Sequence, residues 1–364
     1  MTLMTYVYLI AGLVLLVAGA EVLVRGAAKL AAQFGIPPLV IGLTVVAFGT
    51  SAPETAVSVQ SAFNGSGDLA IGNVIGSNIA NVLLILGMTA LVAPLIVSRQ
   101  LIRLDVPIMI GASLVTFGLA WDGELSRLDG ALLFGGVLAY TGFLIYNARK
   151  ENKSDDDEFA KEFGLDEQPK PYAWAINLGL VIVGLVLLVG GSNLLVEGAV
   201  QLARALGLSE LVIGLTVIAI GTSLPELATS IIAAFKGERD IAVGNIVGSN
   251  IFNLLCVLGL ASLVSPAAIP VAANALAFDF PVMIAVAVAC LPIFFSGYRI
   301  NRWEGLLFLA YYVAYTLYLV LFSTGRPQAE SFGDAMIGYA LPLTAITLVI
   351  ITVRSWRSHR KAGI

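Results

Sequence analysis

Apolar residues fill most of the chain in long runs, and short polar stretches separate these runs. A bilayer's hydrocarbon core, about 30 Å thick, needs roughly 20 apolar residues per helix to cross it. Eleven runs of about this length can be read in the sequence: 4–24, 38–63, 69–93, 104–121, 128–147, 174–196, 210–235, 241–264, 276–296, 303–322 and 335–353. The pattern therefore predicts an all-α polytopic membrane protein with eleven transmembrane helices.

Two long segments of the chain are close copies of each other. Ile41–Gly87 matches Ile213–Gly259 without a gap at an offset of 172 residues, and more than half of the positions are identical. The match resumes upstream, where residues 12–27 resemble residues 184–199. Each copy holds five predicted helices, and because five is odd the second copy enters the membrane from the opposite side. The sequence thus predicts two inverted five-helix repeats, as in many secondary transporters, and one extra C-terminal helix.

The predicted organisation follows these repeats. The first repeat covers residues 1–150, an acidic cytoplasmic linker covers 151–173, the second repeat covers 174–322, and the extra helix with a basic tail covers 323–364. The acidic centre of the linker, Asp155–Glu158, lacks the spaced ligands and the glycine of an EF-hand loop. We interpret it as a solvated linker rather than a calcium-sensing patch.

The basic residues predict the orientation in the membrane. If the N-terminus lies outside, 17 of the 20 Lys and Arg residues face the inside, and only Arg127, Arg204 and Arg326 face the outside. This agrees with the excess of basic residues in cytoplasmic loops. We therefore expect a protein of the cell (inner) membrane with an external N-terminus and a cytoplasmic C-terminus.

Composition supports the membrane assignment and narrows the chemistry. The chain is 58% hydrophobic and only 12% charged, whereas soluble domains carry about 25% charged residues. Both cysteines, Cys256 and Cys290, fall inside predicted helices, and the single histidine, His359, lies in the C-terminal tail. We expect no disulfide framework, no cysteine-based metal site, no cofactor and no nucleic-acid partner.

Each copy places a carboxylate deep in an apolar run, at Glu54 and Glu226. Such a residue is costly in a membrane and is by default a functional candidate. A proline just before each glutamate, Pro53 or Pro225, removes a backbone donor and interrupts the helix. Freed carbonyls beside a carboxylate are typical of cation sites in transporters. The preceding hydroxyl residues lie on or near the same face: Thr50, Ser51, Thr222 and Ser223.

The helix after each glutamate adds further oxygen atoms. Ser77 and Asn81 are four residues apart and share a helix face, and Ser249 and Asn253 repeat the arrangement. For four other asparagines we expect packing or capping roles: Asn73, Asn78, Asn245 and Asn250. An all-oxygen set with two carboxylates suits a hard cation, and calcium accepts irregular oxygen cages more readily than magnesium does. Calcium is the expected ion, and monovalent ions could share the same oxygens.

The two motifs carry a family resemblance. GTSAPE followed by GNVIGSNIANVLLILG, repeated as GTSLPE and GNIVGSNIFNLLCVLG, resembles the two alpha-repeats of the sodium/calcium exchanger family of the calcium/cation antiporter superfamily. The resemblance covers about residues 1–322 and implies sodium-driven calcium antiport by alternating access.

The resemblance also implies a set of ion ligands. Glu54, Glu226 and the Thr50 and Thr222 carbonyls would surround calcium. One sodium site would use Glu226 with Ser51, Ser77 and the Ala47 carbonyl, and its inverted mate would use Glu54 with Ser223, Ser249 and the Ala219 carbonyl. Asn81 and Asn253 would flank the centre. Some exchangers, potassium-dependent ones among them, carry Asp at the position of Asn253, so the asparagine argues against potassium co-transport.

The sequence also allows other functions. A proton/calcium antiporter is the nearest alternative, although such relatives typically carry an asparagine-containing glycine motif before the glutamate. An intramembrane enzyme would need a catalytic pair such as Asp105 and Asp279, but these residues begin predicted helices, where N-capping is expected. A passive channel is less consistent with inverted repeats around a midplane site.

Overall fold

A computed structural model describes residues 3–151, 172–206, 219–344 and 346. The segment 152–171 holds most of the predicted linker, and 207–218 holds the start of the second motif; both lie outside the described residues, as do the basic tail and His359. The described chain is helical apart from two very short β-ribbons.

The first copy runs through α8. Its elements are α1 (Leu3–Phe34), α2 (Pro38–Ile41), the π-helical η1 (Gly42–Val46), α3 (Ala47–Thr50), α4 (Ala52–Phe63), α5 (Gly67–Ala80), the π-helical η2 (Asn81–Leu86), α6 (Gly87–Val92), β1 (Leu95–Ile96), the π-helical η3 (Leu101–Asp105), α7 (Val106–Leu119), the 3₁₀ turn η4 (Ala120–Asp122), β2 (Glu124–Leu125) and α8 (Arg127–Glu151).

The second copy and the C-terminal segment follow. Their elements are α10 (Ala173–Ala205), α12 (Ala219–Gly221), α13 (Leu224–Phe235), α14 (Arg239–Phe252), the π-helical η6 (Asn253–Val257), α15 (Leu258–Val264), β3 (Ile269–Pro270), the π-helical η7 (Ala275–Asp279), α16 (Phe280–Phe295), β4 (Arg299–Ile300), α17 (Arg302–Ser323), α18 (Gln328–Ala335) and the π-helical η8 (Met336–Ala340).

The length and composition of these helices identify a polytopic membrane protein. Within the described residues, eight helices are long and apolar enough to cross a membrane, or nine if the bent pair Pro38–Thr50 and Ala52–Phe63 forms one span. The two other predicted spans, 210–235 and 335–353, lie partly outside the described residues. The count of eleven therefore stays a prediction.

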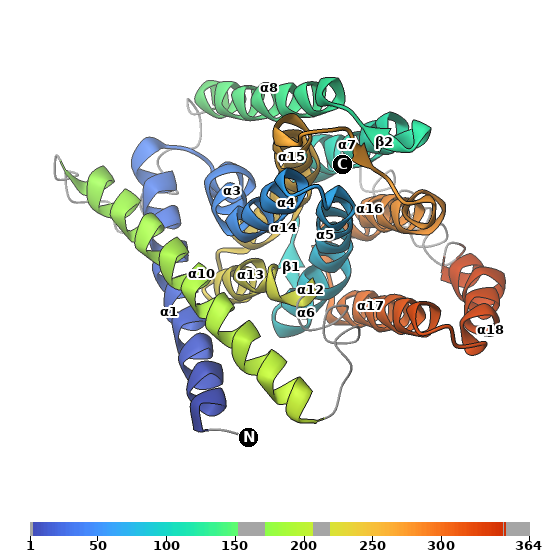
Figure 1. Cartoon of the computed structure of the whole chain (residues 1–364). Helices are drawn as coiled ribbons and strands as arrows, with labels where there is room; N and C mark the ends of the chain where they lie inside the picture. The colour runs from blue at the N-terminus through green and yellow to red at the C-terminus, as the bar shows by residue number, and fades with distance from the viewer. Residues whose placement is uncertain (1–2, 152–171, 207–218, 345, 347–364) are drawn as a thin grey trace.

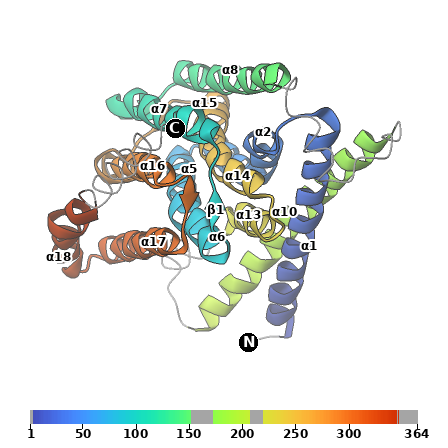
Figure 2. The same cartoon turned by 180° about the vertical axis from the view of Figure 1, so that it is seen from behind.

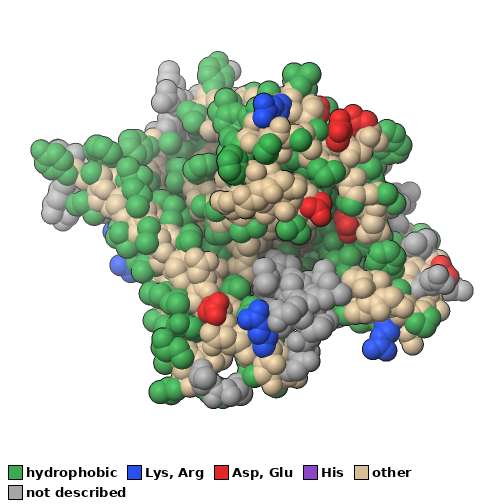
Figure 3. Space-filling model, viewed as in Figure 1, with side chains coloured by type: hydrophobic (Ala, Val, Ile, Leu, Met, Phe, Trp, Pro, Cys, Tyr) green, Lys and Arg blue, Asp and Glu red, His purple; other side chains and the backbone are tan. Residues whose placement is uncertain are grey.

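The surface supports the same assignment. Large apolar side chains are exposed along α1, α8 and α10, including Ile10, Val14, Leu138 and Val186. Figure 3 shows hydrophobic side chains spread over much of the visible face, with only scattered acidic and basic groups. A surface of this kind is stable against lipid, not against water.

The centre of the molecule is formed by the helices that carry the duplicated motifs. The apolar windows of Gly67–Val92 and Arg239–Val264 are 78% and 89% buried, whereas those of the other long helices are 11–39% buried. Figures 1 and 2 show α4, α5, α13 and α14 in the middle, with α7, α8, α16 and α17 around them. The motif helices of both copies are thus the most buried ones, and they hold the polar motif residues in the interior.

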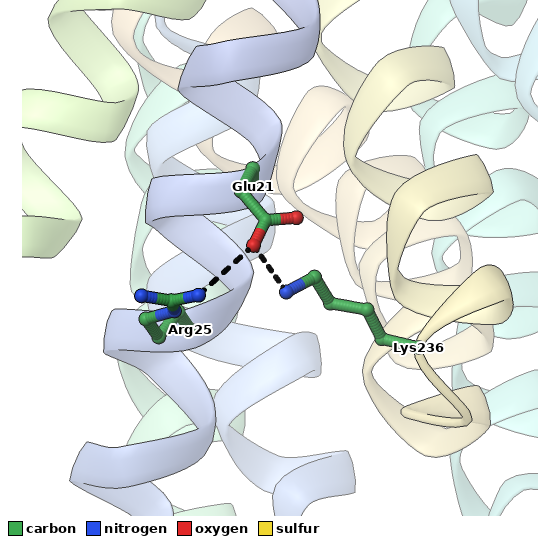
Figure 4. A network of polar contacts seen from close by, with 3 residues as sticks. All are labelled: Glu21, Arg25 and Lys236. Atoms are coloured by element: carbon green, nitrogen blue, oxygen red, sulfur yellow. Dashed lines mark hydrogen bonds and ion pairs between the residues drawn. The ribbon is translucent and has the colours of Figure 1, made fainter.

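Helices α1 and α10 form a separate, closely packed pair that crosses on one side of this centre (Figure 1). Glycines allow the close approach: a Cβ added at Gly12 would lie 2.6 Å from Leu195 N, and one at Gly184 would lie 2.6 Å from Leu23 N. An ion pair attaches α1 to the centre, because Lys236 at the end of α13 lies 2.5 Å from Glu21 and Arg25 lies 3.3 Å from the same oxygen (Figure 4).

Two β-ribbons join loops of the two copies, and the sequence pattern did not predict them. Strand β1 pairs antiparallel with β4, with Leu95 opposite Ile300, and β2 pairs with β3, with Leu125 opposite Ile269. Strands of two residues are too short to show an alternating apolar pattern. The expectation of a purely helical chain is corrected in this detail only.

The expected N-capping role of Asp105 and Asp279 is wrong. Both residues have helical backbone angles at the end of a π-helical segment and make no capping hydrogen bond. Asp105 instead accepts hydrogen bonds from Tyr140 (3.0 Å) and Gln100 (3.2 Å), and Asp279 accepts one from Tyr315 (3.1 Å). The helix continues through these positions, so the side chains are available to a tyrosine of a neighbouring helix.

The C-terminal segment packs beside α17. The Tyr311 hydroxyl donates a hydrogen bond to the Ala340 carbonyl (3.1 Å) and lies against the Thr344 hydroxyl. An apolar cavity of about 450 Å³ separates α18 and η8 from α16 and α17. The described part of this segment, α18 and η8, packs against α16 and α17 of the second copy.

The glycine packing between α1 and α10 gives a testable prediction. A Cβ added at Gly191 would lie 2.7 Å from Leu16 N, whereas one added at the adjacent Gly190 meets nothing within 4 Å. We expect Gly191→Ala to lower the free energy of unfolding by about 1–3 kcal/mol through overpacking, measured by denaturation in detergent.

Gly190→Ala is the matched control, since it makes the same chemical change one residue away on the same helix. Alanine raises helix propensity, so we expect this variant to be neutral or slightly stabilised. Equal effects of the two substitutions would show that close helix approach is not what the glycine provides.

Candidate functional site

Both copies break their helix at the residue three positions before the glutamate. In the first copy Ser51 has φ −77° and ψ 11°, and the axes of the flanking helices differ by 47°. In the second copy Ser223 has φ −90° and ψ 8°, between α12 and α13. Pro53 and Pro225 lie in the first turn of the helix that follows. The predicted interruption of the helix is therefore present in both copies.

The break places each glutamate in the first turn of a new helix at the centre of the molecule. Glu54 is 0% exposed and Glu226 is 1% exposed. One carboxylate oxygen of each accepts a hydrogen bond from the serine at the break in the other copy: Ser223 lies 3.0 Å from Glu54, and Ser51 lies 3.2 Å from Glu226. The second oxygen of each glutamate has no hydrogen-bond partner among the described residues.

The other hydroxyl residues of the predicted site take different positions. The Ser77 hydroxyl accepts a hydrogen bond from Ser223 (3.3 Å), the serine that also contacts Glu54. The resemblance instead grouped Ser77 with Ser51 and Glu226. The Ser249 hydroxyl is buried and has no partner among the described residues. Ser77 and Ser249 thus occupy matching sequence positions with unequal contacts.

The threonines use their hydroxyls for contacts with asparagines. Thr50 donates to Oδ1 of Asn245 (3.0 Å) and lies 3.4 Å from the Ala47 carbonyl, and Thr222 lies 3.5 Å from Oδ1 of Asn73. Thr50 is fully buried, whereas Thr222 is half-buried. Ala47 and Ala219 begin α3 and α12, the helices that end just before the breaks.

The two central asparagines begin matching π-helical segments, η2 at Asn81 and η6 at Asn253. Asn81 donates to Oδ1 of Asn250 (2.9 Å), while its own oxygen is without a partner in the described part of the chain. Asn253 is fully buried, and neither polar atom of its amide has a partner there. π-Helical turns are frequent at functional sites.

Sequence reasoning missed the part played by the remaining four asparagines. Asn73 and Asn245 bond the glutamate main chains and the threonines, and Asn78 and Asn250 contact the sulfurs of Met283 (3.8 Å) and Met109 (3.5 Å). Each of these pairs repeats at the offset of 172 residues, the same signal that identified Glu54 and Glu226. The assignment to packing or capping overlooked this signal.

The donor set suits a hard cation. Several buried oxygens of the predicted site lack a hydrogen-bond partner within the described residues, namely those of Glu54, Glu226, Asn81, Ser249 and Asn253. Buried polar atoms in native proteins are nearly always paired with protein, water or ion. No group of three or more His, Cys, Asp or Glu side chains gathers in the described residues, so such an ion would be held mainly by neutral oxygens and two carboxylates.

These features define a polytopic helical membrane protein with two carboxylates buried at its centre, which is a property of ion-transporting proteins. The chain matches the family described as "Sodium/calcium exchanger protein" over residues 4–146 and 176–321. It belongs to this family of cation/calcium exchangers, and it is therefore a transporter rather than an enzyme.

Individual relatives agree with this assignment. The chain is 34% identical to the "Sodium/calcium exchanger MaX1" of Methanosarcina acetivorans, over 88% of this chain and 99% of the relative. It is 42% identical to the "Inner membrane protein YrbG" of Escherichia coli, over 77% and 85% of the two chains. A solved structure of the sodium-calcium exchanger NCX_Mj superposes with a TM-score of 0.73 at 31% identity, covering 86% of this chain and 98% of the other.

Proposed function

We propose that this protein is a secondary active antiporter that exchanges sodium for calcium across the membrane. The observation that carries the proposal is the pair Glu54 and Glu226, which are fully buried and each retain one carboxylate oxygen with no partner among the described residues. Two carboxylates neutralise one divalent cation, and calcium accepts an irregular cage of oxygens. The burial would be costly without an ion or a proton.

The ligand set proposed for calcium is Glu54, Glu226 and the carbonyls of Thr50 and Thr222. The hydroxyls of both threonines are directed at asparagines, which leaves the carbonyls as the threonine groups proposed to bind the ion. Oδ1 of Asn81 and both amide atoms of Asn253 have no hydrogen-bond partner in the described part of the chain, which supports their proposed place beside the centre.

Two sodium sites are proposed on either side of calcium. One consists of Glu226, Ser51, Ser77 and the Ala47 carbonyl; the other consists of Glu54, Ser223, Ser249 and the Ala219 carbonyl. The hydrogen bonds from Ser51 to Glu226 and from Ser223 to Glu54 support this grouping. Ser77 lies beside Ser223, so it borders both sets. Sodium ions that share the glutamates with calcium would compete with it, as antiport requires.

We infer an inverted arrangement of the two copies and alternating access to the site. Matched contacts support the equivalence of the copies, because the bonds of Tyr140 to Asp105 and of Tyr315 to Asp279 are counterparts. Inverted repeats around a midplane site favour alternating access. We place the N-terminus outside and the C-terminus in the cytoplasm, in the cell membrane; the similar YrbG is named an inner membrane protein.

The paired carboxylates give the central prediction. Glu54→Gln and Glu226→Gln each keep the side-chain shape but remove one negative charge. We expect either variant to fold and to lose calcium transport, because one carboxylate cannot neutralise a divalent ion. Calcium uptake into vesicles under an opposing sodium gradient measures this.

Glu124→Gln is the matched control, since Glu124 is exposed in the short strand β2 and lies outside the site. It should transport like the wild type. Normal uptake by Glu54→Gln or Glu226→Gln would remove the paired carboxylates from the mechanism.

The counter-ion is tested separately. If sodium competes for the glutamate oxygens, calcium uptake in wild-type vesicles should require an opposing sodium gradient and should persist when a protonophore dissipates the pH gradient. Uptake that needs the pH gradient and ignores sodium would instead identify a proton/calcium antiporter.

A further inference from the structure

Asn245 joins the two copies at the site through a single buried amide. It lies in α14 and is 0% exposed. Its Nδ2 donates to the Glu226 main-chain carbonyl (3.4 Å) and to Oγ of Ser230 (3.1 Å), both in α13. Its Oδ1 accepts the hydrogen bond of the Thr50 hydroxyl (3.0 Å), which comes from the first copy. Three of the four hydrogen bonds that an asparagine amide can make are therefore used.

Asn73 makes the counterpart set of contacts from α5. Its Nδ2 donates to the Glu54 carbonyl (3.3 Å) and to Oγ of Ser58 (2.9 Å). Its Oδ1 lies 3.5 Å from the Thr222 hydroxyl of the second copy. Each asparagine thus holds the glutamate main chain of its own copy and the threonine of the other copy.

These contacts define a role other than ion binding. Both N–H groups of each amide donate to protein oxygens and its oxygen accepts from threonine, so three hydrogen bonds fix the amide within the protein. The atoms that it holds belong to the residues directly beside the two carboxylates, at the point where both helices are broken. Backbone hydrogen bonds such as that from Ser51 N to the Ala47 carbonyl (3.0 Å) bridge each break within its own copy. The asparagine side chains add a link between the two copies.

We propose that Asn73 and Asn245 are positioning residues, a reciprocal pair of amide clamps that holds the broken segment of each copy against the glutamate of the other. The clamps keep Thr50 beside Glu226, and Thr222 beside Glu54, so that both carboxylates face one divalent ion. This inference rests on the proposed function, because it assigns the clamps to the Glu54–Glu226 pair.

The proposal has a consequence for ion selectivity. Calcium needs both carboxylates and both threonine carbonyls in one geometry, whereas a sodium ion needs only one carboxylate and its nearest oxygens. Loss of a clamp should therefore weaken calcium binding more than sodium binding. A merely structural role would lower stability without changing the ratio of the two affinities.

The test compares ion affinities of purified protein by titration calorimetry. We expect Asn245→Ala to raise the calcium Kd about tenfold, because the hydrogen bonds that it removes together change a dissociation constant by about one order of magnitude. The sodium Kd should change far less. Asn73→Ala should act in the same direction but less strongly, because its contact with threonine is longer (3.5 Å against 3.0 Å).

Asn177→Ala is the matched control. Asn177 is also a buried asparagine that bonds across two helices, since its Nδ2 donates to Gln33 (3.2 Å), but it joins α10 to α1 away from the site. This variant should lose thermal stability and keep both ion affinities.

A second variant covers the case in which Asn245→Ala does not fold. Thr50→Val removes only the hydroxyl that bonds Asn245 and keeps the main-chain carbonyl, so it should shift the ratio of calcium to sodium affinity in the same direction. In the double variant the two effects should be less than additive, because both substitutions break the same bond.

The outcomes separate this inference from the proposed function. A wild-type protein that binds no calcium overturns both. Calcium binding that is abolished by Glu54→Gln, together with an unchanged calcium-to-sodium ratio in Asn245→Ala or Thr50→Val, overturns only the clamps. A selective loss of calcium affinity in these variants supports them.

Discussion

The crossed hydrogen bonds between the two glutamates and the two serines are the interaction on which the centre depends. A carboxylate inside a membrane domain is destabilising unless it is paired, protonated or bound to an ion. Here Ser223 donates a hydrogen bond to Glu54, and Ser51 donates one to Glu226. Each copy therefore supplies the hydroxyl that bonds the carboxylate of the other copy. Neither copy could form this site alone, which explains why the two motifs must pack face to face in the interior.

The helix breaks make these bonds possible. Ser51 and Ser223 are themselves the residues at which the helical backbone angles are interrupted, and the glutamates follow within one turn. In an unbroken helix the backbone N–H and C=O groups would bond one another. The serine and glutamate side chains would then keep the fixed spacing of a regular helix. Irregular backbone is tolerated in a membrane only where it is buried in protein or lines a cavity, and the central helices provide that burial.

A less buried layer surrounds this centre. The long helices α1 and α10 pack on each other through glycines, and the ion pair of Glu21 and Lys236 attaches α1 to the centre. Their outward faces are apolar, as expected for contact with lipid. Buried polar contacts are therefore concentrated where the motifs meet, whereas the outer pair is held by close glycine packing with a few polar contacts such as Asn177 to Gln33.

The sequence by itself determined the class of the protein, the repeat, the positions of the helix breaks and the two acidic residues. These features are local or periodic: apolar runs of about 20 residues, a proline before each glutamate, and one constant offset between copies. The same offset also marked Asn73 and Asn245, but it did not state what they contact. A repeat shows which residues are equivalent, not which residues meet.

Only the tertiary structure decided the partners. Ser51 and Glu226 are 175 residues apart, Thr50 and Asn245 are 195 apart, and Asp105 bonds a tyrosine 35 residues away. The two β-ribbons likewise pair loops from different copies. Such contacts depend on how whole helices pack, and helix packing follows from the combined shape of many side chains and not from the spacing of a few. The physical reason is that apolar periodicity sets which face of a helix is buried, while the identity of the neighbour is set by the fold.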